Sequence, residues 1–384
     1  MKFLRYIFRP LLGIIFALIL LLTSFFGNSV IMLTLPMLFF NRHYQWRLLI
    51  DRSISFWIII PIALLEYIFG MEIKVTGDMI DYDYPAIIIM NHRTRLDWMY
   101  FWVALFKINP WLLTSSKIAL KAELRYMPAA GFAMEANQFI FLDRKIKTDK
   151  ERISEAIHYY ASIGNNYQIL LFPEGTDKTS NTTMKSNVYA KKNGLKQLNN
   201  LIYPRSAGFI HFIKEMRRHN YIECIYDVTI AYPVNIVQSE VGLFLTGRIP
   251  QKVLFHIERI DLSCIPLKDH DIAQWINELW IAKDEKLDLF YSQQSPRIHF
   301  PNDRNKFVWK DDNPLHKMVK LLTLCFWSLM TAFWFYHLTF LRFVQVLFGY
   351  FIFLSAYVYA KYGGIQRMVY IKWWHVVKAE TINL

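Results

Sequence analysis

The sequence predicts an α/β domain with a mostly parallel sheet flanked by helices, together with membrane helices at both ends of the chain. Residues 11–40 and 318–360 are apolar and carry few charged side chains. Between them, short apolar runs alternate with polar stretches of helical period, which favours a parallel sheet covered by helices. The chain is 54% hydrophobic and 17% aromatic, more than is usual in soluble domains, which indicates that part of it lies in lipid.

We expect residues 1–70 to form membrane-embedded or interfacial helices. A straight helix over residues 11–40 would be roughly 45 Å long, against about 30 Å of bilayer hydrocarbon. This segment is therefore expected either to tilt or to break near residues 23–29, where a glycine and an asparagine weaken a helix. Residues 54–69 are a shorter apolar stretch with a proline and a glutamate. We expect a helix there that lies in the interface or against the first segment rather than a full span.

Residues 71–315 are expected to form a single α/β domain. The segments 85–90, 167–172 and 227–233 have the continuous apolar character of buried strands. Residues 149–162 place apolar side chains at the period of a helix. Strands separated by helices in this way predict a largely parallel core.

Residues 316–384 are expected to form a membrane hairpin followed by a basic tail. The apolar segments 318–340 and 343–360 are separated near Arg342. Lysines and arginines precede and follow this hairpin, and they also precede the N-terminal apolar segment. Because positive charge is retained on the cytosolic side of membranes, the α/β domain is predicted to face the cytosol.

The formal net charge of +13 indicates an anionic partner. On so apolar a chain we expect that partner to be the anionic surface of a membrane, and the sequence contains no motif for nucleic-acid recognition. The eleven histidines and three cysteines are scattered without the spacing of a metal site, so we expect neither a metal nor a bound cofactor.

The first candidate site lies in the sequence NHRTRLD, directly after the first predicted strand. His92 and Asp97 are five residues apart, so they can meet only if His92 lies in a loop and the helix begins near Thr94. A carboxylate bonded to one imidazole nitrogen fixes the tautomer and suits the histidine to act as a general base. Thr94 and Asp97 also fit an N-terminal capping box, in which His92 would be an ordinary loop residue. The spacing leaves both interpretations open.

Three further segments are weak signals when each is taken alone. Residues 173–176, Pro-Glu-Gly-Thr, form a turn after a strand where Glu174 and Gly175 can reach a ligand, although most such turns only end a strand. Arg144 follows an apolar run and can hold a phosphate with its planar fork, or can be a solvated loop residue. Residues 228–233 are an apolar strand closed by a proline.

Taken together, these segments resemble the motifs of the glycerolipid acyltransferase family. They follow the family's order: an H-x4-D motif at His92 and Asp97, a G-F…R block at 131–144, a P-E-G motif at 173–175 and a proline-terminated strand at 228–233. The resemblance covers about residues 85–233. Each motif alone is a weak signal, and they are specific for the family only when they occur together. The sequences KNGL and PRSAGF are most similar to the lysocardiolipin acyltransferase branch.

The resemblance implies an acyl-CoA-dependent enzyme of the endoplasmic reticulum membrane that acylates lysophosphatidylinositol, lysophosphatidylglycerol or lysocardiolipin. His92 would deprotonate the free hydroxyl of the lysophospholipid, and Asp97 would orient the imidazole. Acyl-CoA would be a co-substrate, and no cofactor is implied. The residues implied to bind the head-group phosphate and glycerol are Arg144, Glu174, Gly175 and Thr176.

Asp177 departs from many phosphatidic-acid-forming members, which carry arginine after P-E-G-T. An aspartate would repel a terminal dianionic phosphate, so we expect a phosphodiester acceptor rather than lysophosphatidic acid. A 1-acylglycerol-3-phosphate acyltransferase stays the alternative within the family. Outside it, the same residue pair can activate water in a lipid or thioester hydrolase, or the chain can be a non-enzymatic membrane scaffold.

Overall fold

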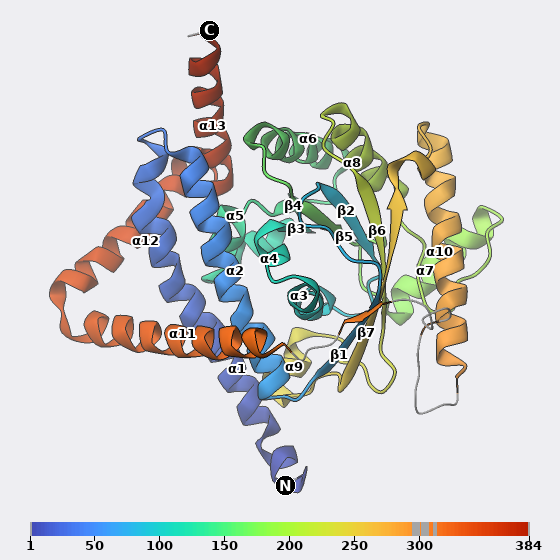
Figure 1. Ribbon diagram of the computed structural model, residues 1–384, viewed down its shortest axis with the longest axis horizontal. Coiled ribbons are helices and arrows are strands. Elements are labelled where there is room, and N and C mark those ends of the chain that lie inside the picture. Colours follow the sequence, from blue (N-terminus) through green and yellow to red (C-terminus); the bar gives the residue numbers. More distant parts are fainter. Residues whose placement is uncertain (1, 294–299, 301–306, 310–312, 383–384) are drawn as a thin grey trace.

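A computed structural model describes residues 2–293, 300, 307–309 and 313–382 of the protein. Within these residues the strands form one sheet in the order β4-β3-β5-β2-β6-β7-β1-β8 (Figure 1). The neighbours from β4 to β6 are parallel, β7 runs antiparallel to β6, and β1 is parallel to β7 and antiparallel to β8. The predicted α/β class with a mostly parallel sheet is confirmed. The strands are β1 (Glu72–Gly77), β2 (Ala86–Met90), β3 (Ser116–Lys121), β4 (Ile140–Leu142), β5 (Gln168–Leu171), β6 (Cys224–Ala231), β7 (Lys252–Asp261) and β8 (Phe307–Trp309).

The central strand β2 is buried on both faces, because helices cover the sheet on either side. Ile87 and Ile89 belong to a core that includes side chains of three helices, and Ile88 belongs to the core on the other face. This alternation follows from the two-residue period of a strand. The first core includes side chains of α6 (Ile146–Ile163), α8 (Ser206–Arg218) and α10 (Asp269–Tyr291), and the second includes side chains of α3 (Asp97–Ile108); helices from both ends of the chain also contribute to each. The shorter helices are α4 (Leu112–Ser115), α5 (Ala130–Ala136), α7 (Ser180–Lys192) and α9 (Glu240–Thr246).

The first helix, α1 (Lys2–Thr34), continues without a break through residues 23–29. Tertiary contacts explain why the helix-weakening residues do not interrupt it. Gly27 lies against the indole ring of Trp327, and the Asn28 side chain donates a hydrogen bond to the Ala129 carbonyl at 2.8 Å. The segment was expected either to tilt or to break, and the expectation of a break is therefore wrong.

The second helix, α2 (His43–Tyr67), is longer than the sequence indicated. It begins eleven residues before the predicted start at residue 54, and at 25 residues it is long and apolar enough to cross a membrane. The expectation of a segment too short to span is therefore wrong. The helix packs against α1, which was one of its two predicted placements. Of the 18 residues in its most apolar segment, 61% are buried inside the protein.

The C-terminal part contains the two predicted apolar helices and a third helix. α11 (Pro314–Phe340) and α12 (Arg342–Tyr362) meet at Leu341, next to the predicted break. The segment expected as a basic tail forms helix α13 (Ile365–Ile382). Figure 1 shows α1, α2, α11, α12 and α13 together on one side of the sheet. Within the described residues, α1, α2, α11 and α12 are long and apolar enough to span a membrane, so the protein is membrane-associated.

A buried cluster of charges joins α2 to the sheet. The Asp51 carboxylate on α2 accepts hydrogen bonds from Arg47 at 2.6 Å, from Lys117 on β3 at 2.7 Å and from the Tyr167 hydroxyl at 2.8 Å. Lys117 also donates to the Asn137 side chain at 2.9 Å. Burial lowers the pKa of Lys117 to about 7, and the attraction of Asp51 opposes that shift.

Replacing Asp51 by asparagine should destabilise the protein by about 3–5 kcal/mol, because the buried Arg47 and Lys117 lose the charge that compensates them. Thermal unfolding in detergent micelles measures this as a fall in Tm. The control Glu285→Gln removes an exposed partner of Lys196 and should leave Tm close to that of the unmodified protein. Equal Tm values for the two variants would contradict a stabilising role of the cluster.

Candidate active site

The carboxyl ends of the parallel strands bring the separate sequence motifs to one edge of the sheet. His92 follows β2, Arg144 follows β4, Glu174 follows β5 and Tyr232 follows β6. A backbone hydrogen bond from the Lys178 N–H to the His92 carbonyl, at 2.9 Å, joins two of these loops. A second one, from the Gly175 N–H to the Phe172 carbonyl at 2.9 Å, closes the turn after β5. Residues far apart in the sequence therefore surround one site.

His92 and Asp97 form a hydrogen-bonded pair, with 3.0 Å between His92 Nδ1 and Asp97 Oδ2. Because a carboxylate only accepts hydrogen bonds, Nδ1 carries the proton and Nε2 of the neutral ring has a lone pair. No hydrogen bond to Nε2 occurs among the described residues. The ring lies against Phe172 with 4.1 Å between the ring centroids, and the His92 side chain is 16% exposed. The imidazole is thus held in one orientation with its basic nitrogen available.

Asp97 is fully buried and accepts hydrogen bonds from four groups besides His92. The backbone N–H groups of Arg93 and Thr94 donate at 2.6 and 2.9 Å, and the Thr94 hydroxyl donates at 2.8 Å. The hydroxyl of Tyr232 is the fourth donor. Such a set of donors fixes the carboxylate in position and satisfies its buried oxygens.

The helix after His92 begins at Asp97 and not near Thr94, so that part of the prediction is wrong. The residue before the helix is Leu96, which makes no side-chain cap. Thr94 makes one half of a capping box, because its N–H donates to the Asp97 carboxylate at 2.9 Å. The reciprocal half is not formed, since the Asp97 N–H donates to the Thr94 carbonyl and the Thr94 hydroxyl donates to the Asp97 carboxylate. The His92–Asp97 contact that the first interpretation requires is therefore present together with a partial cap, and its catalytic use stays a prediction.

Glu174 lies beneath the His92 loop and is 2% exposed. Its Oε1 atom accepts hydrogen bonds from the His92 N–H at 3.3 Å and from the Trp280 indole N–H at 3.2 Å. Burial raises the pKa of Glu174 to about 8, although both of these hydrogen bonds act in the opposite direction. The predicted contact between Glu174 and substrate stays a prediction. In the structure this carboxyl group supports the backbone of the candidate base.

Arg144 and Gly175 lie against each other although 31 residues separate them. The Arg144 guanidinium donates to the Gly175 carbonyl oxygen at 2.6 Å and is otherwise exposed. Both residues have left-handed backbone angles, with φ of +62° at Arg144 and +72° at Gly175. A non-glycine residue in this region carries backbone strain, which is common at ligand sites. Thr176 follows in the same turn and donates to the Asp177 carboxylate at 3.4 Å.

Three residues of the site carried no recognisable signal in the sequence. Tyr232 was part of a segment that indicated only a core strand, yet its hydroxyl reaches Asp97. Trp280 comes from α10, far from any motif. The Asn91 side chain bonds both backbone groups of Ile230, at 3.2 and 2.9 Å, and so ties the end of β2 to β6. Among the residues that the structure describes, no three His, Cys, Asp or Glu side chains gather as metal ligands.

The fold and these motifs define an acyltransferase, and comparison with known families agrees. Residues 72–236 match the acyltransferase family, and residues 243–327 match the acyltransferase C-terminus family. The chain belongs to the glycerolipid acyltransferase family, in its lysocardiolipin acyltransferase-like branch.

Individual relatives share most of the chain. Lysophosphatidylinositol acyltransferase 10 of Caenorhabditis elegans is 49% identical over 95% of this chain and 94% of its own. Lysocardiolipin acyltransferase 1 of Mus musculus is 38% identical over 83% of this chain and 84% of its own. A protein of Arabidopsis thaliana named probable 1-acyl-sn-glycerol-3-phosphate acyltransferase 5 is 33% identical over 64% of this chain and 63% of its own.

The raised pKa of Glu174 predicts a pH-dependent stability. Between its ordinary value of 4.5 and about 8, the folded protein retains a proton that the unfolded chain releases. The stabilisation is therefore complete below pH 4.5 and is lost as the pH rises to 8. Glu174→Gln cannot titrate, so the unmodified protein should lose stability relative to this variant across that range. Tm values measured from pH 4.5 to 8 test this.

The exposed Glu278 on α10 provides a control for the Glu174 experiment, because its side chain bonds only Gln274 among the described residues. Glu278→Gln should follow the unmodified protein at every pH. Parallel curves for Glu174→Gln and Glu278→Gln would show that Glu174 titrates normally.

Proposed function

We propose that this protein is an acyl-CoA-dependent lysophospholipid O-acyltransferase. The observation that carries the proposal is the bond from His92 Nδ1 to a buried Asp97, which leaves Nε2 without a partner among the described residues. Family membership supports acyl transfer as the reaction. Residues 71–315 would form the catalytic domain, with membrane-binding parts in residues 1–70 and 316–384.

The proposed reaction is a direct transfer without an acyl-enzyme. His92 Nε2 accepts the proton of the lysophospholipid hydroxyl as its oxygen attacks the thioester carbon of acyl-CoA. A new C–O ester bond forms and the C–S bond breaks. The imidazolium then returns the proton to the departing CoA thiolate. Asp97 fixes the tautomer and balances the positive charge on the ring during the transfer.

In this proposal, Arg144, Gly175 and Thr176 bind the head-group phosphate and glycerol. Arg144 is suited to this role because its guanidinium is exposed apart from its contact with Gly175. Glu174 would contribute by holding the His92 loop, in addition to the substrate contact predicted for it.

The acceptor we propose is a lysophospholipid with a hydroxylated phosphodiester head group: lysophosphatidylinositol, lysophosphatidylglycerol or lysocardiolipin. Asp177, in place of the arginine of many phosphatidic-acid-forming relatives, supports this choice. So do the names of the worm and mouse relatives. Acylation of 1-acylglycerol 3-phosphate is the second candidate, and the name of the plant relative favours it. A panel of lysolipids with several acyl-CoAs separates the two.

His92→Ala should lower kcat with acyl-CoA and lysophosphatidylinositol by about 10²–10⁴-fold, because it removes the general base. The protein should remain folded, as judged by an unchanged Tm. His270→Ala is the control, since His270 is exposed on α10 and should leave kcat unchanged. Retained activity in His92→Ala would contradict the proposal. Release of CoA without a diacyl product would indicate a hydrolase instead.

We also propose that the protein lies in the endoplasmic reticulum membrane with its catalytic domain on the cytosolic side. The sequon Asn181-Thr182-Thr183 provides a test, because Asn181 is exposed at the start of α7. Protein made in cells should not change its gel mobility on endoglycosidase treatment. A mobility change that the Asn181→Gln variant lacks would place the domain in the lumen.

A further inference from the structure

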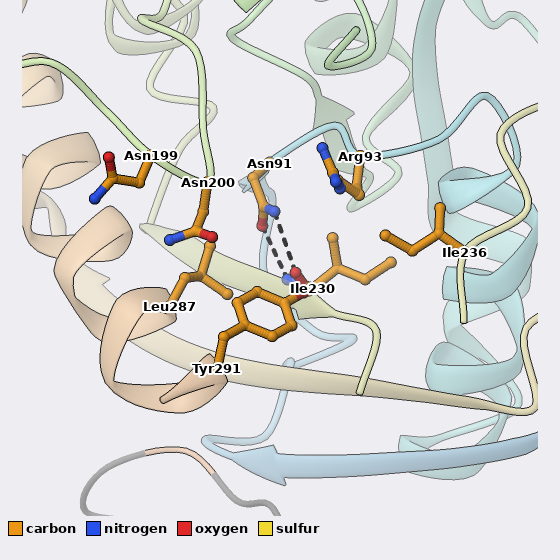
Figure 2. Close-up of a pocket in the computed structure, with 8 residues that line it drawn as sticks. All are labelled: Asn91, Arg93, Asn199, Asn200, Ile230, Ile236, Leu287 and Tyr291. Carbon is orange, nitrogen blue, oxygen red and sulfur yellow. Dashed lines mark hydrogen bonds between the residues drawn. The ribbon is translucent and has the colours of Figure 1, made fainter. Parts of the chain in front are cut away.

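A cavity of about 220 Å³ opens beside the candidate base, lined by the residues on either side of His92. Figure 2 shows it between the carboxyl ends of β2 and β6, helix α10 and the chain that carries Asn199 and Asn200. A cavity of this order can take one ring bearing hydroxyl groups, and it is partly open to solvent.

One wall of the cavity presents acceptor oxygens. The side-chain NH₂ groups of Asn199 and Asn200 donate to the two carboxylate oxygens of Asp288, at 3.0 and 2.7 Å. Since a carboxylate cannot donate, these bonds fix the orientation of both amides. The Oδ1 atoms are then left without a partner among the described residues, and Figure 2 shows that of Asn200 turned toward Ile230. The wall is therefore suited to accept hydrogen bonds from hydroxyl groups.

The same wall is held rigidly in place. The Asp284 carboxylate on α10 accepts hydrogen bonds from the backbone N–H groups of Asn199, Asn200 and Leu201, at 2.7–2.9 Å. A loop held by five hydrogen bonds to two carboxylates has a defined shape before any ligand arrives.

Two other groups that line the cavity can donate hydrogen bonds. The Arg93 guanidinium makes no hydrogen bond or ion pair with any residue that the structure describes, and in Figure 2 it faces the cavity. The Tyr291 hydroxyl accepts the Tyr232 N–H at 3.1 Å, which leaves its own proton to donate. The remaining lining is apolar and consists of Ile230, Ile236 and Leu287.

We propose that this cavity binds the head group of the acceptor: a phosphodiester whose phosphate contacts Arg93 and whose polyol ring, of the size of inositol, contacts Asn200 and Tyr291. Arg144, Gly175 and Thr176 do not line this cavity, so of the two roles proposed for them above they keep the binding of the glycerol part. This inference rests on the proposed function and specifies its acceptor. Only a few covalent bonds separate the phosphate of a lysophospholipid from its free glycerol hydroxyl. A phosphate at Arg93 therefore places that hydroxyl within reach of the adjacent His92.

The test measures binding of soluble head groups to the full-length protein in detergent micelles, with the His92→Ala background to exclude turnover. Glycerophosphoinositol is the probe, and glycerol 3-phosphate, which lacks the ring, is the comparison. Asn200→Leu removes an acceptor oxygen. Ile236→Trp fills the cavity from its partly exposed side without removing a hydrogen bond. Asn187→Leu on α7, outside this cavity, is the matched control.

We expect glycerophosphoinositol to bind at least about tenfold more tightly than glycerol 3-phosphate, a difference of about 1.4 kcal/mol. Both cavity variants should abolish that preference, and Asn187→Leu should retain it. Equal affinity for the two probes in the parent protein, no measurable binding, or an undiminished preference in both cavity variants would overturn the assignment. If the preference holds but the enzyme with His92 intact transfers no acyl chain, the proposed function fails and the head-group site does not.

Discussion

The buried carboxylate of Asp97 is the constraint on which the rest of the site depends. It lies at the first residue of α3, where it accepts hydrogen bonds from the loop before it, from the candidate base and from a tyrosine at the end of β6. A fully buried anion is tolerated only when its oxygens are satisfied in this way. The loop between β2 and α3 therefore closes around one acid, and His92 receives its position and its tautomer from that closure.

The buried carboxylate of Asp51 has a comparable role between helix α2 and the sheet. Asp51 brings Lys117 and Tyr167 from the sheet to a helix that is apolar enough to enter a membrane. The pairing of charges in a dry interior is specific in geometry, because any displacement leaves a charge uncompensated. The amino ends of β3 and β5, at the opposite edge of the sheet from His92, are thus fixed relative to α2. Helix α2 in turn packs against α1 and α11.

The sequence was most informative where local pattern and fold agree. Fully buried parallel strands are continuous apolar runs, so residues 85–90 and 167–172 were located to within one residue at each end. The start of α3 was predicted too early, near Thr94, because threonine is a common N-cap residue. The Thr94 hydroxyl donates to the Asp97 carboxylate, and the helix begins at Asp97. Helix α1 was expected to be vulnerable at Asn28, whose partner Ala129 is 101 residues away. Trp280 and Tyr232 join the site through tertiary packing alone, which no local pattern encodes.

The paired left-handed residues at Arg144 and Gly175 have a further consequence. The strained backbone angle is that of Arg144, since glycine tolerates a positive φ, and the hydrogen bond between the two residues joins their loops. Loops joined in this way lose conformational entropy during folding, so under the proposed role in acceptor binding less entropy remains to be lost when a lipid binds. Under the same proposal, side chains on these two loops could alter the choice of acceptor without moving the separate loop that holds His92 and Asp97.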